Sequence, residues 1–172
     1  KGHPKAQHSL GKMYATGKGV KKDDKEAGNW YRQALTLFKK AATEGDASAE
    51  FALGSMRYNG EGVKQDYRKA AGWYKKAADR EYAEAQYSLA EMLYKGEGVK
   101  KKRLKKAAFW YKQAADQGHV GANTALARLK QDNIDSRSTL QGAVSEGVGD
   151  TQEKKDKAGS EDEANLAVLL NE

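Results

Sequence analysis

Few side chains in this sequence have the types and spacing that catalysis or metal binding requires. The three histidines do not form a metal-binding pair such as His-Glu-x-x-His. His3 and His8 are five residues apart and would lie on different sides of a helix, while His119 is distant in sequence. The chain has no cysteine, which excludes thiolate ligands and disulfide scaffolds. We therefore expect neither a metal site nor a bound cofactor.

The Gly-x-Gly pairs invite comparison with phosphate-binding loops. Gly17-Lys18-Gly19, however, follows a predicted helix rather than a strand, and no Gly-Lys-Ser or Gly-Lys-Thr comes after it. The sequence contains no Gly-x-Ser-x-Gly, and its carboxylates are spread over predicted helix surfaces and caps. We predict turns at these glycines, no catalytic residue, no small-molecule substrate and no enzymatic activity.

The glycine pairs lie within sequence blocks that repeat along the chain. An eleven-residue block occurs three times, and a second block follows each copy. The first block reads LGKMYATGKGV at 10–20, LGSMRYNGEGV at 53–63 and LAEMLYKGEGV at 89–99. The second block reads EAGNWYRQA at 26–34, KAAGWYKKAA at 69–78 and KAAFWYKQAA at 106–115. Each unit predicts a pair of helices, which buries its apolar face only by stacking on its neighbours.

The first helix of each pair has small and apolar residues at helical spacing. These are Ala6, Leu10 and Met13, then Ala49, Leu53 and Met56, then Ala85, Leu89 and Met92. A small residue after each leucine (Gly11, Gly54, Ala90) predicts that a neighbouring helix approaches closely. The Gly-x-Gly pair ends the first helix, with one glycine in the left-handed C′ position.

The second helix is expected to begin after an aspartate cap, Asp23 or Asp66, and to bury its Trp-Tyr and Ala-Ala positions. In the first unit it has about two extra turns, because Leu37 and Phe38 fall where Trp73 and Tyr74 fall in the next unit.

These blocks closely resemble the Sel-1-like repeat, a relative of the tetratricopeptide repeat. The resemblance implies an all-α, right-handed solenoid with units at about 3–46, 47–82 and 83–118 and a partial repeat at 119–129. It also implies an adaptor, receptor, assembly factor or immunity-type protein that binds a protein partner on the concave surface lined by the first helices. Members are often bacterial, and the compartment of this chain stays open.

The chain divides into a basic body and an acidic tail. Residues 1–129 carry a net charge of +12 and all the aromatic residues, while residues 130–172 carry −5. Residues 142–160 read as a linker, and Ser160 with Glu163 forms a capping box before a possible short helix at 161–171. We predict that this helix caps the solenoid, that the tail folds over the basic body, or that the tail is disordered. No apolar run is long enough to span a membrane.

Positions that change between units are the predicted contacts for a protein partner, because framework positions repeat. In the first helices these are His8, Phe51 and Tyr87, then Lys12, Ser55 and Glu91, and also Arg57. The third unit adds Lys101, Lys102 and Arg103, with Arg103 in place of a capping aspartate. Its basic run, Lys100–Lys106, is expected to be a solvated loop or a contact for an acidic protein partner, and the alternative is binding of nucleic acid or an anionic surface.

Overall fold

The computed structural model describes residues 2–99 and 101–145, and their side chains as far as residue 134. This part of the chain contains helices and turns but no β-strand. The helices are α1 (Pro4–Thr16), α2 (Asp24–Thr43), α3 (Ala47–Asn59), α4 (Tyr67–Asp79), α5 (Ala83–Lys95), α6 (Leu104–Asp116) and α7 (Val120–Ser145). The all-α prediction is confirmed.

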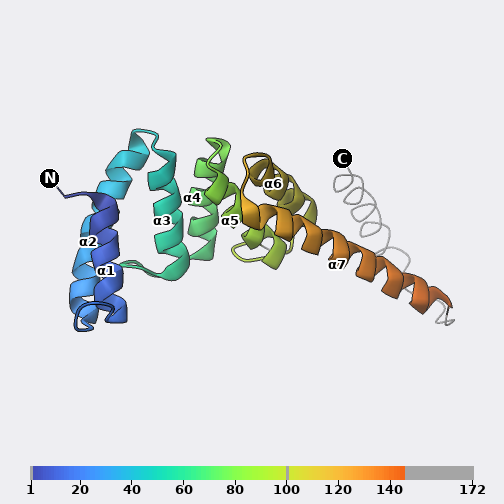
Figure 1. Ribbon diagram of the computed structural model, residues 1–172, viewed down its shortest axis with the longest axis horizontal. Coiled ribbons are helices and arrows are strands. Elements are labelled where there is room, and N and C mark those ends of the chain that lie inside the picture. Colours follow the sequence, from blue (N-terminus) through green and yellow to red (C-terminus); the bar gives the residue numbers. More distant parts are fainter. Residues whose placement is uncertain (1, 100, 146–172) are drawn as a thin grey trace.

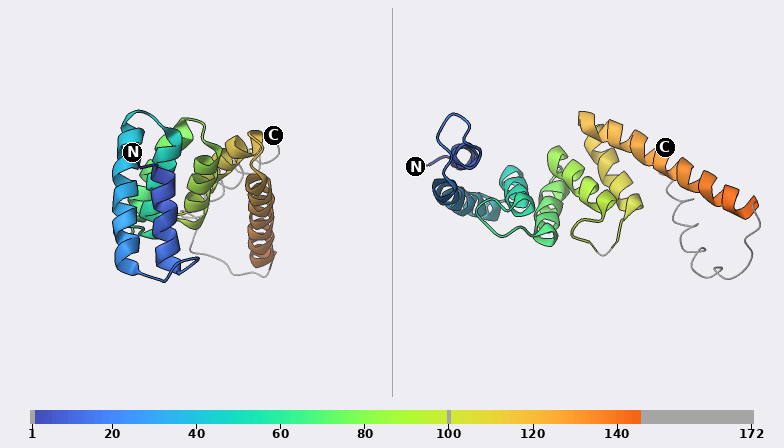
Figure 2. Two further views of the ribbon diagram at one scale, coloured as in Figure 1. Left: turned by 60° about the vertical axis from the view of Figure 1, so that its left-hand side comes forward. Right: turned by 90° about the horizontal axis from the view of Figure 1, so that it is seen from below.

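The helices form layers that follow one another along the chain. Each of α1, α3 and α5 pairs with the helix after it, and α7 packs against α6. We call α1, α3, α5 and α7 the A helices, and α2, α4 and α6 the B helices. Figure 1 shows the pairs in a row along the long axis, with α7 projecting from the far end, and Figure 2 shows the row from two further sides. The predicted solenoid of stacked helix pairs is therefore confirmed.

In the first two layers a tyrosine from the B helix lies against the glycine of its A helix. A Cβ atom added to Gly11 would lie 2.6 Å from Cδ1 of Tyr31, and one added to Gly54 would lie 2.5 Å from Cδ1 of Tyr74. The rings occupy the space that a side chain would fill, which is why these glycines are kept despite their cost in a helix. The predicted close approach is confirmed.

The helix ends follow the predicted chemistry. Asp23 accepts hydrogen bonds from the backbone N–H groups of Lys25 and Glu26, and Asp66 accepts one from Lys69. Each A helix of the three complete layers ends at the first glycine of its Gly-x-Gly, which has a positive φ. Helix α6 begins after Arg103, whose side chain makes no cap hydrogen bond.

Helix α2 contains the extra turns expected for the first unit. It has 20 residues, whereas α4 and α6 have 13 each. Phe38 is buried at 2% exposure, as Tyr74 is in the next layer, so the added turns keep the apolar stripe facing the core.

Helix α1 and the tryptophans differ from the expected burial. Ala6 is exposed, whereas Ala49 and Ala85 are buried, because a preceding B helix covers α3 and α5 but not α1. Trp73 and Trp110 are only half-buried at the edge of the core, where Lys76 and Lys75 respectively lie near their rings. Within each Trp-Tyr pair, the tyrosine is the core residue.

Helix α7 is longer than the predicted partial repeat at 119–129. The A helices before it end at a glycine pair, but the next glycine after Leu129 is Gly142, and the helix continues to Ser145. It therefore crosses the predicted boundary at residue 130 and includes the first residues of the predicted linker. The rest of that linker and the predicted helix at 161–171 lie outside the described residues.

A buried polar residue near the start of one A helix pairs with an exposed residue at the end of the B helix in the same layer. Arg80 Nε donates to Glu50 Oε2 at 3.2 Å, with Glu50 3% exposed. In the next layer the pair is neutral, since Gln117 Nε2 donates to Gln86 Oε1 at 2.8 Å. The two layers thus use a charged and an uncharged version of the same contact.

This difference leads to a prediction about stability. Replacing Arg80→Gln leaves the buried carboxylate of Glu50 without its cation and should lower the free energy of unfolding by about 1–3 kcal/mol, less than for a fully buried pair because Arg80 is half-exposed. Adding Glu50→Gln copies the next layer and should recover most of that loss. Urea denaturation of the four chains tests this, and a double variant no more stable than Arg80→Gln would contradict it.

Candidate functional site

The hydroxyl groups of the core tyrosines reach the A helices at the positions predicted to vary. Tyr74 Oη donates to Ser55 Oγ at 3.2 Å, and Tyr111 Oη donates to Glu91 Oε1 at 2.6 Å. Lys12, Ser55, Glu91 and Arg128 occupy this position in successive layers, and we call the surface around them the A face. The side chains of Ser55 and Glu91 are therefore held in place by the core below them.

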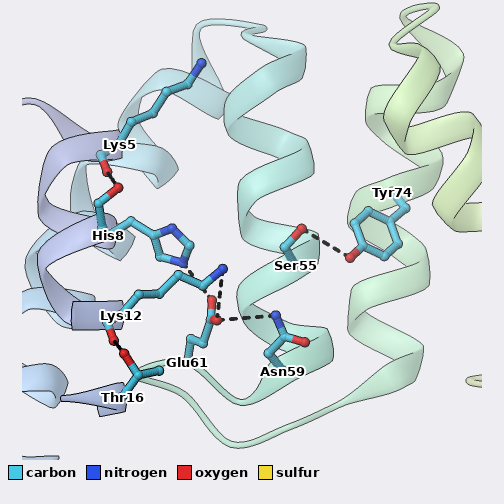
Figure 3. Close-up of polar contacts among 9 residues, drawn as sticks. Lys5, His8, Lys12, Thr16, Ser55, Asn59, Glu61 and Tyr74 are labelled. Carbon is cyan, nitrogen blue, oxygen red and sulfur yellow. Dashed lines mark hydrogen bonds and ion pairs between the residues drawn. The ribbon is translucent and has the colours of Figure 1, made fainter. Parts of the chain in front are cut away.

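His8 and Lys12 meet at a carboxylate from the next layer. His8 Nε2 lies 2.6 Å from Glu61 Oε2, and Lys12 Nζ lies 3.9 Å from Glu61 Oε1 (Figure 3). Asn59 Nδ2 also donates to Glu61. Burial alone would raise the pKa of Glu61, but the hydrogen bond with His8 and the charges around it hold that pKa below its usual value. This cluster links α1 to the turn after α3.

Glu91 is the centre of a second cluster between layers. Its carboxylate lies 2.6 Å from Arg128 Nη2 on α7 and 3.2 Å from Lys95 Nζ on its own helix. Burial would raise the pKa of Glu91, but hydrogen bonds from Tyr111, Arg128 and Lys95 outweigh burial and lower it. Burial and the bond to Glu91 raise the pKa of the Tyr111 hydroxyl. Glu91 is thus ionised and fixed in orientation at neutral pH.

A small cavity lies on the A face between α3 and α5. Its volume is about 170 Å³, and tyrosine rings and carboxylates form much of its wall. Its lining residues are Tyr58, Tyr74, Tyr87, Ser88, Glu91, Met92 and Glu97. Tyr58 Oη donates to Glu97 at 2.9 Å, which together with burial raises the pKa of Tyr58 to about 12. Such a wall is suited to a cationic side chain, through its carboxylates and the faces of its rings.

Phe51 and Tyr87 are half-buried rather than fully available to a partner. The ring of Phe51 lies 5.5 Å from that of Tyr74 and 5.3 Å from that of Tyr82. Tyr87 stacks on His119 at 4.4 Å, which joins α5 to the start of α7. Both residues help pack their layers, and each leaves part of its ring at the surface.

Arg57 does not lie with the other predicted contacts on α3. It is two residues beyond Ser55, about 200° around the helix. Its counterpart in the next layer, Leu93, lines a groove on the side of the B helices. The sequence grouped Arg57 with Phe51 and Ser55 because all three positions vary, but their places on the helix separate them.

Lys101, Lys102 and Arg103 form an exposed basic turn before α6. Lys102 Nζ lies 5.6 Å from the centre of the Tyr94 ring, and Arg128 lies over the same ring at 4.4 Å. The backbone N–H of Arg103 donates to the carbonyl of Leu93, which fixes the end of the turn. These three residues stay predicted contacts for an anionic partner.

The structure thus brings His8, Lys12, Ser55, Tyr87 and Glu91 to the A face and its edges. Sequence reasoning missed Glu61 and Arg128, which pair with His8 and Glu91, and it missed the Tyr58–Glu97 pair that lines the cavity beside them. The middle residue of Gly-x-Gly was treated as a turn residue only. This residue is lysine in the first unit (Lys18) and glutamate in the next two (Glu61 and Glu97), and that variation could have indicated that it faces a neighbouring layer.

In the described part of the chain, no group of three or more histidine and acidic residues is arranged to hold a metal ion. Among the helices of the described ranges, none combines the length and the apolar character that crossing a membrane requires. What the A face offers is charge, aromatic surface and shape.

Comparison with known proteins gives related architectures. The Sel1 repeat profile matches residues 4–37, 32–46, 47–82 and 83–119. The chain is similar to a Sel1 repeat protein from Oxalobacter formigenes, with 34% identity, 70% of this chain and 46% of that one covered, and a TM-score of 0.48. A protective antigen present in uropathogenic Escherichia coli, with an SLR fold, is 30% identical over 83% of this chain and 30% of its own, with a TM-score of 0.54.

Helicobacter pylori cysteine-rich protein B shares the fold at 24% identity, with 70% of this chain and 92% of that one covered and a TM-score of 0.53. The chain spans less than half the length of the Oxalobacter and Escherichia proteins. A comparison with curated proteins found no match.

Proposed function

This chain belongs to the Sel1 repeat family, and from that premise we propose that it is a non-catalytic module that binds a protein partner on its concave A face. Sel1 repeat proteins are generally protein-interaction modules, and their fold is typically a non-catalytic scaffold. An adaptor, receptor, assembly factor or immunity-type protein would use such a surface in the same physical way. All four roles require the same thing of the chain, which is a surface that binds a protein partner.

One observation supports this assignment above the others. Framework positions repeat from layer to layer and are buried in α3 and α5, whereas the A face changes its chemistry in every layer, from Lys12 to Ser55 to Glu91. The side chains there are held by contacts between layers, so a partner would meet a preorganised surface. Preorganisation reduces the entropy lost on binding.

The cavity between α3 and α5 is the proposed centre of the contact. The carboxylate of Glu97 and the tyrosine rings favour a lysine or arginine side chain of the partner, whereas Glu91 is already paired with Arg128 and Lys95. The net charge of +12 on residues 1–129 still predicts a partner that is acidic overall. A partner that is acidic overall and inserts one cationic side chain meets both requirements.

A bulky substitution in the cavity tests the proposal. Ser88 lines the cavity and is half-buried, so Ser88→Arg should fill it and place the new cation against the carboxylate that a partner's cation would use. We expect a loss of about tenfold or more in partner affinity, as for the loss of a binding hot spot. The measurement is affinity capture from the source organism by the full chain, followed by titration of the captured protein.

The matched control places the same residue on the B helices. Thr36→Arg introduces arginine at an exposed position of α2 and should leave affinity unchanged. Thermal melting of both variants reports whether the fold is retained. Equal binding by the two variants would contradict the A-face proposal. Binding of nucleic acid with a steep salt dependence, unaffected by Ser88→Arg, would favour the alternative based on the basic turn.

A further inference from the structure

A larger groove lies on the opposite side of the layers, between α4 and α6. Its volume is about 570 Å³, and its floor is formed mainly by apolar side chains. The apolar lining residues are Leu89, Leu93, Val99, Phe109 and Trp110. Phe109 is 47% exposed, although it is one of the largest apolar residues of α6. A large exposed aromatic beside an apolar groove is typical of a binding surface.

The edge of this groove is positively charged. Lys75, Arg103, Lys105 and Lys106 all contribute to its lining. The ammonium group of Lys75 is 2.7 Å from Asp79, so that charge is already neutralised. Arg103 and Lys106, near the start of α6, therefore set the sign of the potential at this edge. A ligand with carboxylates next to aliphatic side chains would match it.

Three positions at the groove differ from those of the preceding layer. The preceding layer has Arg57, Asp66 and Gly72 where this one has Leu93, Arg103 and Phe109. The changes to Leu93 and Phe109 add apolar surface. The change to Arg103 replaces a helix-capping carboxylate with a cation that lines the groove. Loss of the aspartate cap costs about 1 kcal/mol in typical helices. Packing between layers does not require these changes, because the preceding layer folds without them.

We propose that the occupant of this groove is the acidic C-terminal segment of the same chain, residues 160–172. Its sequence, SEDEANLAVLLNE, has four acidic residues and no basic one. Leu166, Leu169 and Leu170 have the i, i+3, i+4 spacing of one helix face. Aliphatic side chains would lie on the Trp110 and Phe109 surface while the carboxylates at 161–163 meet Arg103 and Lys106.

The length of chain between the groove and this segment is sufficient. Leu129 packs against Ala108 of α6, and from there α7 rises about 24 Å to Ser145. Residues 146–159 span up to about 50 Å when extended, roughly twice the distance that α7 leads away. The segment can therefore return to α6, and a tether of this length gives an effective concentration in the millimolar range.

Disulfide trapping in the full chain tests the proposal. The native chain has no cysteine, so two introduced cysteines are the only thiols. Gly72→Cys places one in the groove, where an added Cβ meets no atom within 4 Å, and Asn171→Cys places the other beside the apolar run. The control pairs Asn171→Cys with Thr124→Cys, an exposed position on α7 that is nearer in sequence to the tail.

We expect an intramolecular disulfide with Gly72→Cys at about ten times the yield with Thr124→Cys. Replacing Arg103→Glu and Lys106→Glu should lower the groove yield several-fold, and adding Glu161→Lys and Glu163→Lys should restore it. Equal yields at the two sites, or no disulfide at either, would overturn the proposal. Disulfide-linked dimers would overturn the proposal and indicate that a second copy of the chain occupies the groove. A disulfide yield that does not change when Arg103 and Lys106 are replaced by glutamate would also overturn it, because the proposal rests on the attraction between these cations and the acidic segment.

Discussion

Replacing Tyr111→Ala is expected to lower the free energy of unfolding by about 3–5 kcal/mol, the range for removing a large buried aromatic side chain. Tyr111 has 0% exposure and is among the largest fully buried side chains of the described residues. Its ring lies 5.8 Å from that of Tyr87, and its hydroxyl bonds Glu91. The variant would leave a cavity between α5, α6 and α7. Denaturant titration followed by circular dichroism measures the loss.

Tyr111→Phe separates the ring from the hydroxyl. It keeps the packing and removes the hydrogen bond to Glu91, a carboxylate that Arg128 and Lys95 still neutralise, together with the longer bond that the hydroxyl accepts from Arg128 Nη2 at 3.2 Å. We expect a loss of about 1–2 kcal/mol for this variant, typical of one hydrogen bond to a charged group. If Tyr111→Ala is no less stable than Tyr111→Phe, the ring is not a central packing element of its layer.

The features that the sequence predicted well are those that recur within one unit. Helical spacing, a glycine pair and a capping aspartate act over a few residues, so their meaning does not depend on the rest of the fold. This is why the caps at Asp23 and Asp66 and the lengthened α2 were predictable. The close contact at Gly54 was also predictable, because a glycine inside a strong helical pattern needs a packing reason.

Contacts between layers were not predictable in the same way. The His8–Glu61 pair joins residues 53 apart, and the Glu91–Arg128 pair joins residues 37 apart. Their formation depends on the offset between neighbouring layers, which periodicity within a helix does not determine. Charges that vary between repeats indicate a surface, but only the stacking geometry shows which of them face each other.

The third unit shows that an irregularity in sequence can be located before it can be interpreted. Arg103 stands where the other units have a capping aspartate, so the sequence alone showed a departure from the repeat and suggested contact with an anionic partner. The apolar half of the same surface, Leu93 and Phe109, was not recognised because both fit a helical pattern. Only the structure brings these residues together around one groove.

The second glycine of Gly-x-Gly forms a contact between layers in addition to its part in the turn. At Gly98, φ is +70°, and an added Cβ would lie 2.5 Å from the carbonyl oxygen of Tyr67 in the B helix of the preceding layer. Gly98→Ala therefore combines left-handed strain of about 1–2 kcal/mol with a clash against backbone that cannot rotate away. We expect a total loss of about 3 kcal/mol in the free energy of unfolding, measured by urea denaturation.

Gly118→Ala is the matched control for this prediction. Its φ of +82° imposes the same left-handed strain, but no atom lies within 4 Å of an added Cβ, so only about 1–2 kcal/mol should be lost. The difference between the two variants isolates the contact between layers from the conformational cost of the turn. Equal losses would mean that the Gly98 turn does not press on α4, and the second glycine would then serve the turn alone. A larger loss at Gly98 would show that the repeat keeps this glycine because successive layers touch there through their backbones.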